Sequence, residues 1–183
     1  GGSRVIPADA VCDPQLVGPV DLAFLWVKAF DTATATESAL PALDRSTRVV
    51  TLQNGLGNLE AIARFVDRAH LIGGTTSCGA TLLDVGAVRH TGRGETILGR
   101  PDGAADSRVE RAAAVLTSAG IPTEVSDAVG SAIWSKLILN AAINPLTAIT
   151  GLENGRLLDD QQTRRLLDLV AAESQRIASA AGI

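Results

Sequence analysis

Three polar side chains stand at intervals of four residues in an otherwise apolar stretch of the sequence. They are Lys136, Asn140 and Asn144, within residues 133–149. Because four residues advance a helix about 40° beyond one full turn, the three side chains share one narrow stripe. A buried ammonium or amide without a partner costs about 1–3 kcal/mol or more. The stripe therefore predicts a polar cleft, where these groups meet protein atoms, water or a ligand.

The same stretch predicts a helix that is largely buried, because its remaining residues are apolar on nearly every side. Pro145 removes the N–H that would bond to the carbonyl of Ala141, so we expect a kink beside the stripe. Two alternatives stay open. The helix could end at the proline, and Lys136 could extend to solvent while the two asparagines bond to neighbouring backbone.

A second group of candidate residues follows two predicted strands. Residues 53–57, Gln-Asn-Gly-Leu-Gly, come directly after an apolar run, and Lys28 ends an earlier run. In open α/β sheets, ligands bind in the crevice at the carboxyl ends of the strands. Lys28 would face the same crevice as residues 53–57. The alternatives are an ordinary turn and a solvated lysine.

Strands and helices alternate over the first two thirds of the chain. Apolar runs predict strands at residues 21–27, 48–52 and 70–74, two short strands as a hairpin within 87–98, and an edge strand at 122–125. Helical patterns cover residues 31–43, 58–67, with Asn58 as the cap, and 107–119. This order predicts an α/β fold with a doubly wound parallel sheet.

The character of the sequence changes near residue 126. Helical patterns cover residues 128–150 and 157–181, and no strand pattern follows residue 126. We therefore expect two domains, an α/β domain over residues 1–126 and an all-α domain over residues 127–183. The chain contains no methionine, so we also expect it to be an internal piece of a longer protein.

Composition excludes several classes of protein. The chain has 183 residues with 16 Lys and Arg against 20 Asp and Glu, so it lacks the basic field of a nucleic-acid-binding protein. No uninterrupted apolar run reaches the roughly 18 residues of a membrane span, and no targeting signal opens the chain. Cys12 and Cys78 are too few and too distant for a metal site. We expect a soluble cytoplasmic protein with free thiols.

Taken together, these segments resemble the ketopantoate reductase family, whose members reduce 2-dehydropantoate to pantoate with NADPH. The resemblance rests on five motifs in the expected order. They are D-L-A-F-L-W-V-K-A (21–29), L-Q-N-G-L-G-N (52–58), G-T-T-S-C-G-A (74–80), H-T-G-R-G-E-T (90–96) and W-S-K-L-I-L-N-A-A-I-N-P-L-T-A (134–148), followed by E-N-G-R-L (153–157). It implies an incomplete Rossmann-like domain, followed by the first part of a helical domain similar to the C-terminal domain of 6-phosphogluconate dehydrogenase.

The resemblance also implies roles for single residues. Lys136 would be the general acid that protonates the ketone oxygen. Asn140, Asn144 and Asn154 would bind the substrate, a small 2-keto acid. Lys28, Asn54 and Gly79 would contact the cofactor, NADP(H). A homodimer is left open by the resemblance.

The chain departs from the family pattern in two respects. No G-x-G-x-x-G turn opens it, so NADPH preference follows from the resemblance alone, and we expect the 183-residue piece to be inactive by itself. Cys78 stands where relatives commonly carry a histidine. Other functions remain open. The chain could be part of another dehydrogenase of the same superfamily that acts on hydroxyacids or ketoacids, of a catalytically idle nucleotide- or metabolite-binding homologue, or of a structural protein whose helices pair with another chain.

Overall fold

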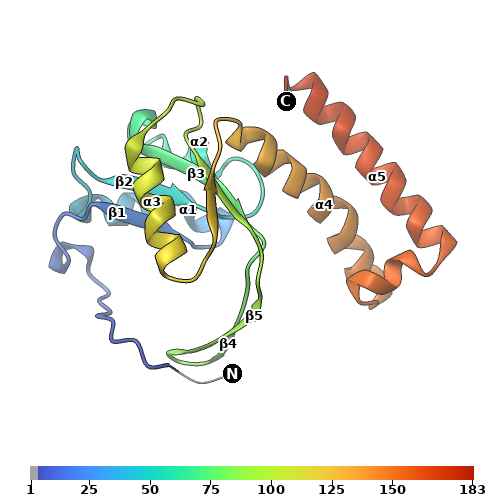
Figure 1. Cartoon of the computed structure of the whole chain (residues 1–183), viewed down its shortest axis with the longest axis horizontal. Helices are drawn as coiled ribbons and strands as arrows, with labels where there is room; N and C mark the ends of the chain where they lie inside the picture. Colours follow the sequence, from blue (N-terminus) through green and yellow to red (C-terminus); the bar gives the residue numbers. More distant parts are fainter. Residues whose placement is uncertain (1–3) are drawn as a thin grey trace.

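A five-stranded sheet forms the centre of the N-terminal part of the molecule. The structure is a computed structural model and describes residues 4–183, so the first three residues of the predicted first domain lie outside it. The strands are β1 (Leu22–Leu25), β2 (Arg48–Thr51), β3 (Leu71–Thr76), β6 (Thr96–Gly99) and β7 (Thr123–Val125), in the order β1-β2-β3-β6-β7 (Figure 1). The predicted strand at 122–125 is confirmed as β7, at the edge of the sheet.

The first three strands pair in parallel. β2 is buried along its length and β3 over its first four residues, whereas β1, at the edge of the sheet, is partly exposed. Val49, Val50, Leu71 and Ile72 are fully buried there. β6 pairs antiparallel with β3, and β7 pairs parallel with β6. The sheet as a whole therefore contains both parallel and antiparallel pairs. The predicted α/β class with a Rossmann-like sheet is confirmed.

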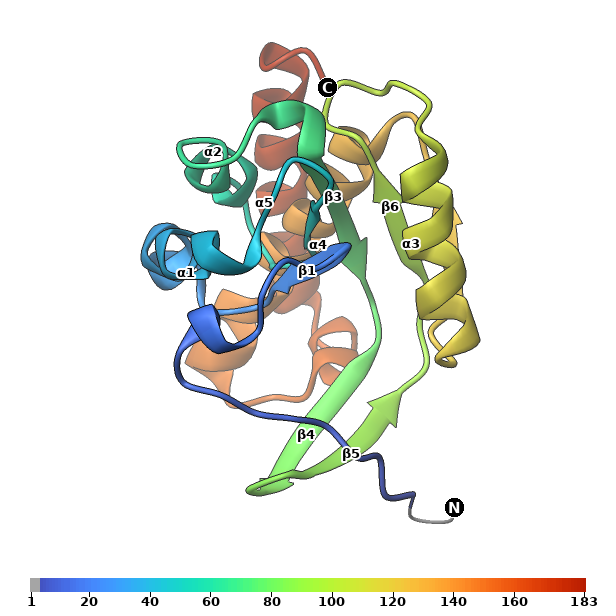
Figure 2. The same ribbon diagram turned by 90° about the vertical axis from the view of Figure 1, so that its left-hand side faces the viewer.

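Helices cover both faces of the sheet, as Figure 2 shows. On one face, α1 (Thr32–Ala39) and α2 (Asn58–Ile62) lie over a core that contains Leu25, Val49, Ile62 and Leu71. On the other face, α3 (Ser107–Ser118) packs on Val50, Ile72 and Leu98 through Val109, Ala112, Ala113 and Leu116. The helix predicted at 107–119 is confirmed, with Asp106 as its cap.

The helix predicted at 58–67 is wrong in length and in its cap. α2 ends at Ile62, and the amides of Phe65 and Val66 both bond back to the carbonyl of Ile62 in a tight turn. This turn lets Val66 pack on the same core as Ile62. Gly57, not Asn58, is the N-cap residue, with a φ of +85° that favours glycine.

The hairpin predicted within residues 87–98 is also wrong. β5 (Ala87–Gly92) pairs with β4 (Gly79–Asp84), and the turn between them lies at Val85 and Gly86. Residues 93–95 lead from this ribbon into β6 of the main sheet. The strand before β4 is longer than predicted, because β3 pairs with β6 as far as Thr76. The ribbon extends beyond the sheet (Figures 1 and 2).

Two long helices form the C-terminal part. α4 (Val129–Thr150) and α5 (Gln161–Ala180) lie side by side (Figure 1), and within residues 4–183 no strand follows β7. α4 continues through Pro145 to Thr150, where Gly151 caps it, so a helix that ends at the proline is excluded. The kink, and residue 126 as a domain boundary, stay predictions.

The expectation that α4 is largely buried is wrong. Only Val129 and Ala142 are buried, whereas Leu139 is 61% exposed and Ile149 is 82% exposed. α4 contacts β3 and β6 of the sheet, α5 and the short helix at Asn154–Leu158, and these contacts leave most of its residues at least partly exposed. By length and composition α4 is also apolar enough to cross a membrane, a test that core helices of soluble proteins pass as well.

Candidate active site

A cleft of about 1010 Å³ opens at the carboxyl ends of β1, β2 and β3. Its walls come from the segments that follow these strands and from α4. The polar side chains that line it are Lys28, Asp31, Gln53, Asn54, Thr76, Cys78 and Lys136, and the aromatic ones are Trp26 and Phe30. The crevice predicted at the strand ends is therefore present, and chain segments far apart in sequence meet in it.

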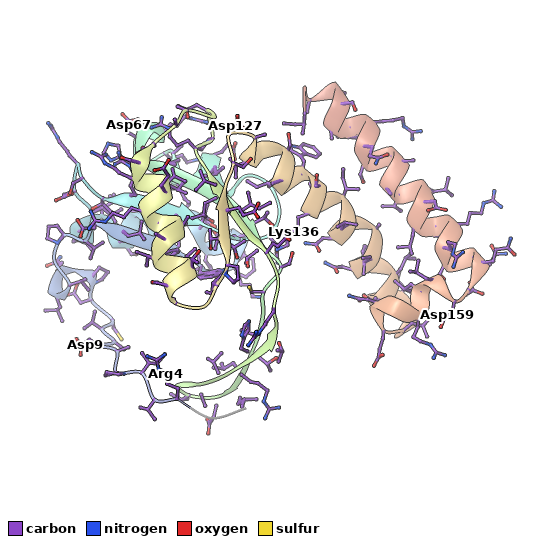
Figure 3. All side chains as sticks on the ribbon, in the orientation of Figure 1. Arg4, Asp9, Asp67, Asp127, Lys136 and Asp159 are labelled. Atoms are coloured by element: carbon purple, nitrogen blue, oxygen red, sulfur yellow. The ribbon has the colours of Figure 1, made fainter. Side chains whose placement is uncertain are left out.

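Lys136 is the residue that joins α4 to this cleft. Its ammonium donates a hydrogen bond to the main-chain carbonyl oxygen of Thr76, the last residue of β3. Figure 3 shows Lys136 on the side of α4 that faces the sheet. The side chain is partly buried, and this burial lowers the pKa of the ammonium from its ordinary value. A lower pKa makes the ammonium a better proton donor.

Gln53 holds the ends of β1 and β2 together. Its side-chain nitrogen donates to the carbonyl oxygen of Val27 at 2.6 Å and to the hydroxyl of Thr32 at 2.9 Å. Its side-chain oxygen accepts from the hydroxyl of Thr51 at 2.8 Å. These bonds use both ends of the amide, so Gln53 fixes one wall of the cleft.

Asn58 extends this hydrogen-bond network to residues that do not line the cleft. It is buried, accepts from the hydroxyl of Thr32 at 3.2 Å and donates to the carbonyl oxygen of Asn54 at 3.2 Å. Thr32 is buried as well, so the loop that carries Asn54 is tied to the start of α1. Asn58 was expected to cap α2 and instead anchors this loop.

Lys28 and Asn54 line the cleft with exposed side chains, as their predicted contact with a ligand requires. Gly79 is the first residue of β4 and stands between Cys78 and Ala80, which both line the cleft. A Cβ at Gly79 would lie 3.0 Å from the hydroxyl oxygen of Thr91 on the paired strand, so the ribbon is closely packed there.

The three asparagines assigned to the substrate do not line this cleft. Asn140 follows Lys136 by one turn, about 6 Å along the helix, and is partly buried. Asn144 lies about 12 Å along and is exposed, and Asn154 is exposed at the start of the turn that precedes α5. The stripe thus runs from the cleft along α4, and contact of these residues with a substrate stays a prediction.

Sequence reasoning assigned no role to Thr76, Cys78 or the side chain of Gln53. The acceptor for Lys136 is a backbone carbonyl, which has no signature in a sequence. The amide of Cys78 donates to the hydroxyl of Thr76 at 3.2 Å, and hydrogen bonding with Thr76 lowers the pKa of the Cys78 thiol. The strand-end position of Gln53 was the available signal for that residue.

Two family models match the chain. The model described as "Ketopantoate reductase PanE/ApbA" matches residues 1–103, and the model described as "Ketopantoate reductase PanE/ApbA C terminal" matches residues 128–183. The chain belongs to the ketopantoate reductase family. The resemblance drawn from the five sequence motifs is therefore confirmed.

Relatives in this family are longer than the chain. A 2-dehydropantoate 2-reductase of Halobacterium salinarum is 38% identical over 183 residues, which is 100% of this chain and 60% of that protein. The crystal structure of a 2-dehydropantoate 2-reductase from Geobacter metallireducens has a TM-score of 0.82 and 32% identity, over 88% of this chain and 54% of that chain. The chain thus spans about 60% or less of the length of these ketopantoate reductase relatives.

A more distant structure shares the fold alone. It is the complex of D-mandelate dehydrogenase with NADH, with a TM-score of 0.84 and 24% identity, over 90% of this chain and 55% of that chain. The chain therefore shares its fold with a dehydrogenase that is named for a different substrate.

Proposed function

We propose that the complete protein reduces 2-dehydropantoate to pantoate with NADPH as the hydride donor, as a soluble cytoplasmic enzyme of pantothenate biosynthesis. The observation that carries the proposal is the position of Lys136, whose ammonium lies partly buried in the wall of the strand-end cleft. Family membership supports the reaction, and the geometry supports the role of the lysine.

Lys136 supplies the proton in this mechanism. Reduction of a ketone needs a hydride at carbon and a proton at oxygen, and the ammonium gives the proton as the hydride arrives. An ammonium has three N–H donors, so it can keep its bond to the Thr76 carbonyl oxygen while a second N–H bonds the ketone oxygen. The neutral amine that remains takes its next proton from solvent.

The residues of the cleft fit part of a nicotinamide cofactor, which would supply the hydride. Trp26 and Phe30 offer flat apolar surfaces, and Lys28 and Lys136 together outnumber the single carboxylate of Asp31. An aromatic ring of the cofactor would match the apolar surfaces, and its anionic groups would match the two lysines. Lys28, Asn54 and the backbone at Gly79 would hold the cofactor. The sequence contains no G-x-G-x-x-G turn, so these residues fit only that part.

The substrate would lie between Lys136 and the asparagine stripe. Asn140 is one helical turn from Lys136, so its amide can hydrogen-bond an oxygen of a substrate whose ketone meets the ammonium. Asn144 and Asn154 would bind more distant oxygens of the 2-keto acid. This orientation places the carboxylate and hydroxyl groups of the substrate along α4.

The experiment is an assay of NADPH oxidation by the complete protein with a panel of 2-keto acids. We expect 2-dehydropantoate to have the highest kcat/KM, and NADPH to be preferred over NADH. A higher kcat/KM with an aryl 2-keto acid would identify another dehydrogenase of the superfamily. Nucleotide binding without turnover of any 2-keto acid would identify a catalytically idle homologue.

A binding measurement tests how much of the cofactor site lies within residues 1–183. We expect the 183-residue chain alone to bind NADPH weakly or not at all, because it lacks a glycine-rich turn for the pyrophosphate. Micromolar affinity by calorimetry would contradict this expectation. Size-exclusion chromatography with light scattering on the complete protein tests the homodimer, which stays a prediction.

A further inference from the structure

Two chain segments meet where the main sheet gives way to the β4–β5 ribbon. β3 continues into β4 through Ser77 and Cys78, and β5 leads into β6 through residues 93–95. The amide of Ser77 donates to the carbonyl oxygen of Glu95 at 2.9 Å, and the thiol of Cys78 donates to the carbonyl oxygen of Gly94 at 3.2 Å. We call residues 76–78 and 94–96 the sheet junction.

Thr76 and Thr96 form a hydroxyl pair at the centre of the sheet junction. They are direct partners in the antiparallel pairing of β3 with β6, and their hydroxyl oxygens are 2.7 Å apart. The hydroxyl of Thr76 also accepts from the amide of Cys78, and its carbonyl oxygen accepts from Lys136. One residue therefore links the buried hydroxyl of Thr96 to the ammonium of Lys136.

Thr96 itself does not reach the cleft. It is 0% exposed and does not line the cleft, whereas Thr76, Cys78 and Lys136 do. Any effect of Thr96 on chemistry must therefore pass through Thr76. A purely structural role, as a buried polar group with a partner, is the competing explanation.

The sheet junction has little room in which to relax. A Cβ at Gly94 would lie 2.5 Å from the carbonyl carbon and oxygen of Ser77, so the two segments are already in close contact. With the peptide at 77 bonded to Glu95 and the hydroxyl at 76 bonded to Thr96, the Thr76 carbonyl has one defined direction. That direction is toward α4 and Lys136.

We propose that Thr96 is a positioning residue for Lys136, which it holds in place through the hydroxyl and carbonyl of Thr76. The proposal rests on the proposed function in that Lys136 is the proton donor. A fixed carbonyl oxygen beside the ammonium stabilises its charged form and opposes the effect of burial. Loss of the Thr96 hydroxyl leaves the Thr76 hydroxyl with only the Cys78 amide as its partner, so the Thr76 carbonyl holds the ammonium in one place less firmly.

The test compares Thr96→Val, which keeps the shape of the side chain, with Thr96→Ser, which keeps the hydroxyl. In the complete protein we expect Thr96→Val to lower kcat about tenfold and to leave KM for NADPH unchanged, since a hydrogen bond to a charged group is weakened. Thr96→Ser should restore most of kcat. Thermal unfolding of each variant measures any loss of folded protein.

A second readout does not depend on turnover. The 13C resonance of the Lys136 side chain, assigned by its absence in Lys136→Arg, reports its titration in protein labelled at lysine. The other charged or titratable groups that line the cleft are Lys28 and Asp31 after β1 and the Cys78 thiol before β4. These three residues keep their side chains in the Thr96 variants, and Thr96→Val removes one of the hydrogen bonds that lower the pKa of the Cys78 thiol. We expect the pKa of Lys136 to fall further in Thr96→Val and to stay at the wild-type value in Thr96→Ser.

Thr75→Val is the matched control. Thr75 precedes Thr76 on β3, and its hydroxyl oxygen is buried with no hydrogen-bond partner in the described part of the chain. Its removal should change neither kcat nor the titration of Lys136. If Thr96→Val fails to fold, Thr76→Val removes the other hydroxyl of the pair and is expected to give the same loss.

The outcomes separate this proposal from the proposed function. Wild-type kcat and an unchanged Lys136 titration in folded Thr96→Val would overturn the positioning role. A protein that reduces no 2-keto acid would overturn the proposed function, and the Lys136 titration would still decide whether Thr96 positions the ammonium. A fall in thermal stability with kcat and titration unchanged would assign Thr96 a structural role only.

Discussion

Lys28 and Lys136 line the same cleft, and they are the only two lysines among the 16 basic residues of the chain. Lys28 comes from the segment after β1, and Lys136 comes from α4. Two ammonium groups against the one carboxylate of Asp31 give the cleft a positive balance. Anionic ligands are attracted to such a cleft, and a 2-keto acid and a nicotinamide nucleotide are both anionic.

Replacement of Lys28 tests its predicted contact with the cofactor. We expect Lys28→Ala to raise KM for NADPH about tenfold and to change kcat little, because a lost hydrogen bond to an anionic group costs about 1.5 kcal/mol. Arg45→Ala is the control, since Arg45 is exposed and precedes β2 at the opposite end of the strand. Equal KM values for Lys28→Ala and wild type would remove Lys28 from the cofactor site.

Gln53 should matter for the shape of the cleft. Gln53→Glu keeps the acceptor for Thr51 and removes the two donated bonds to Val27 and Thr32. We expect a loss of about 1–3 kcal/mol in the free energy of unfolding and a higher KM for NADPH. Urea unfolding and steady-state kinetics measure the two effects. An unchanged KM would mean that the wall of the cleft does not depend on this amide.

The pH dependence of kcat follows from the lowered pKa of Lys136. Reduction needs the protonated lysine, so kcat should be constant below the pKa of Lys136 and fall as the pH rises through it. Because burial lowers that pKa, the fall should lie below the ordinary lysine value of about 10.4. A kcat that stays constant up to that value would contradict the assignment of Lys136 as proton donor.

Close packing at the sheet junction predicts a large difference between two glycines. Gly94→Ala places a Cβ 2.5 Å from Ser77, and we expect a loss of about 1–3 kcal/mol in the free energy of unfolding. Gly155→Ala is the control, because a Cβ there meets nothing within 4 Å and its φ is not positive. Thermal unfolding should separate the two, and equal stabilities would show that the sheet junction can relax.

The sequence predicts the parts of the fold that bury continuous apolar runs. β1 and β2 are short apolar strands between helices, so their patterns are clear. β4 has no such pattern, because most of its residues are exposed, and the hairpin was therefore assigned to residues 87–98 instead. The prediction that α4 is largely buried was wrong, because composition shows that a helix is apolar but does not show which other elements cover it.

The part of the candidate site that follows from local sequence patterns could also be predicted. Lys28, Asn54 and Lys136 are polar residues at strand ends or in an apolar helix, and the structure brings all three to one cleft. The Thr76 carbonyl and the pair of Thr76 with Thr96 depend on the register of β3 with β6, which no local pattern encodes. Asn140 and Asn144 share a stripe with Lys136, but the stripe extends beyond the cleft.

The most direct test of the account is the rate of NADPH oxidation with 2-dehydropantoate by the Lys136→Ala variant of the complete protein. Ser135→Ala, at an exposed neighbouring position on α4, is the matched control. We predict a fall in kcat of about 10²–10⁴-fold for Lys136→Ala and a wild-type rate for Ser135→Ala. A wild-type kcat in folded Lys136→Ala would contradict the central claim that Lys136 is the proton donor.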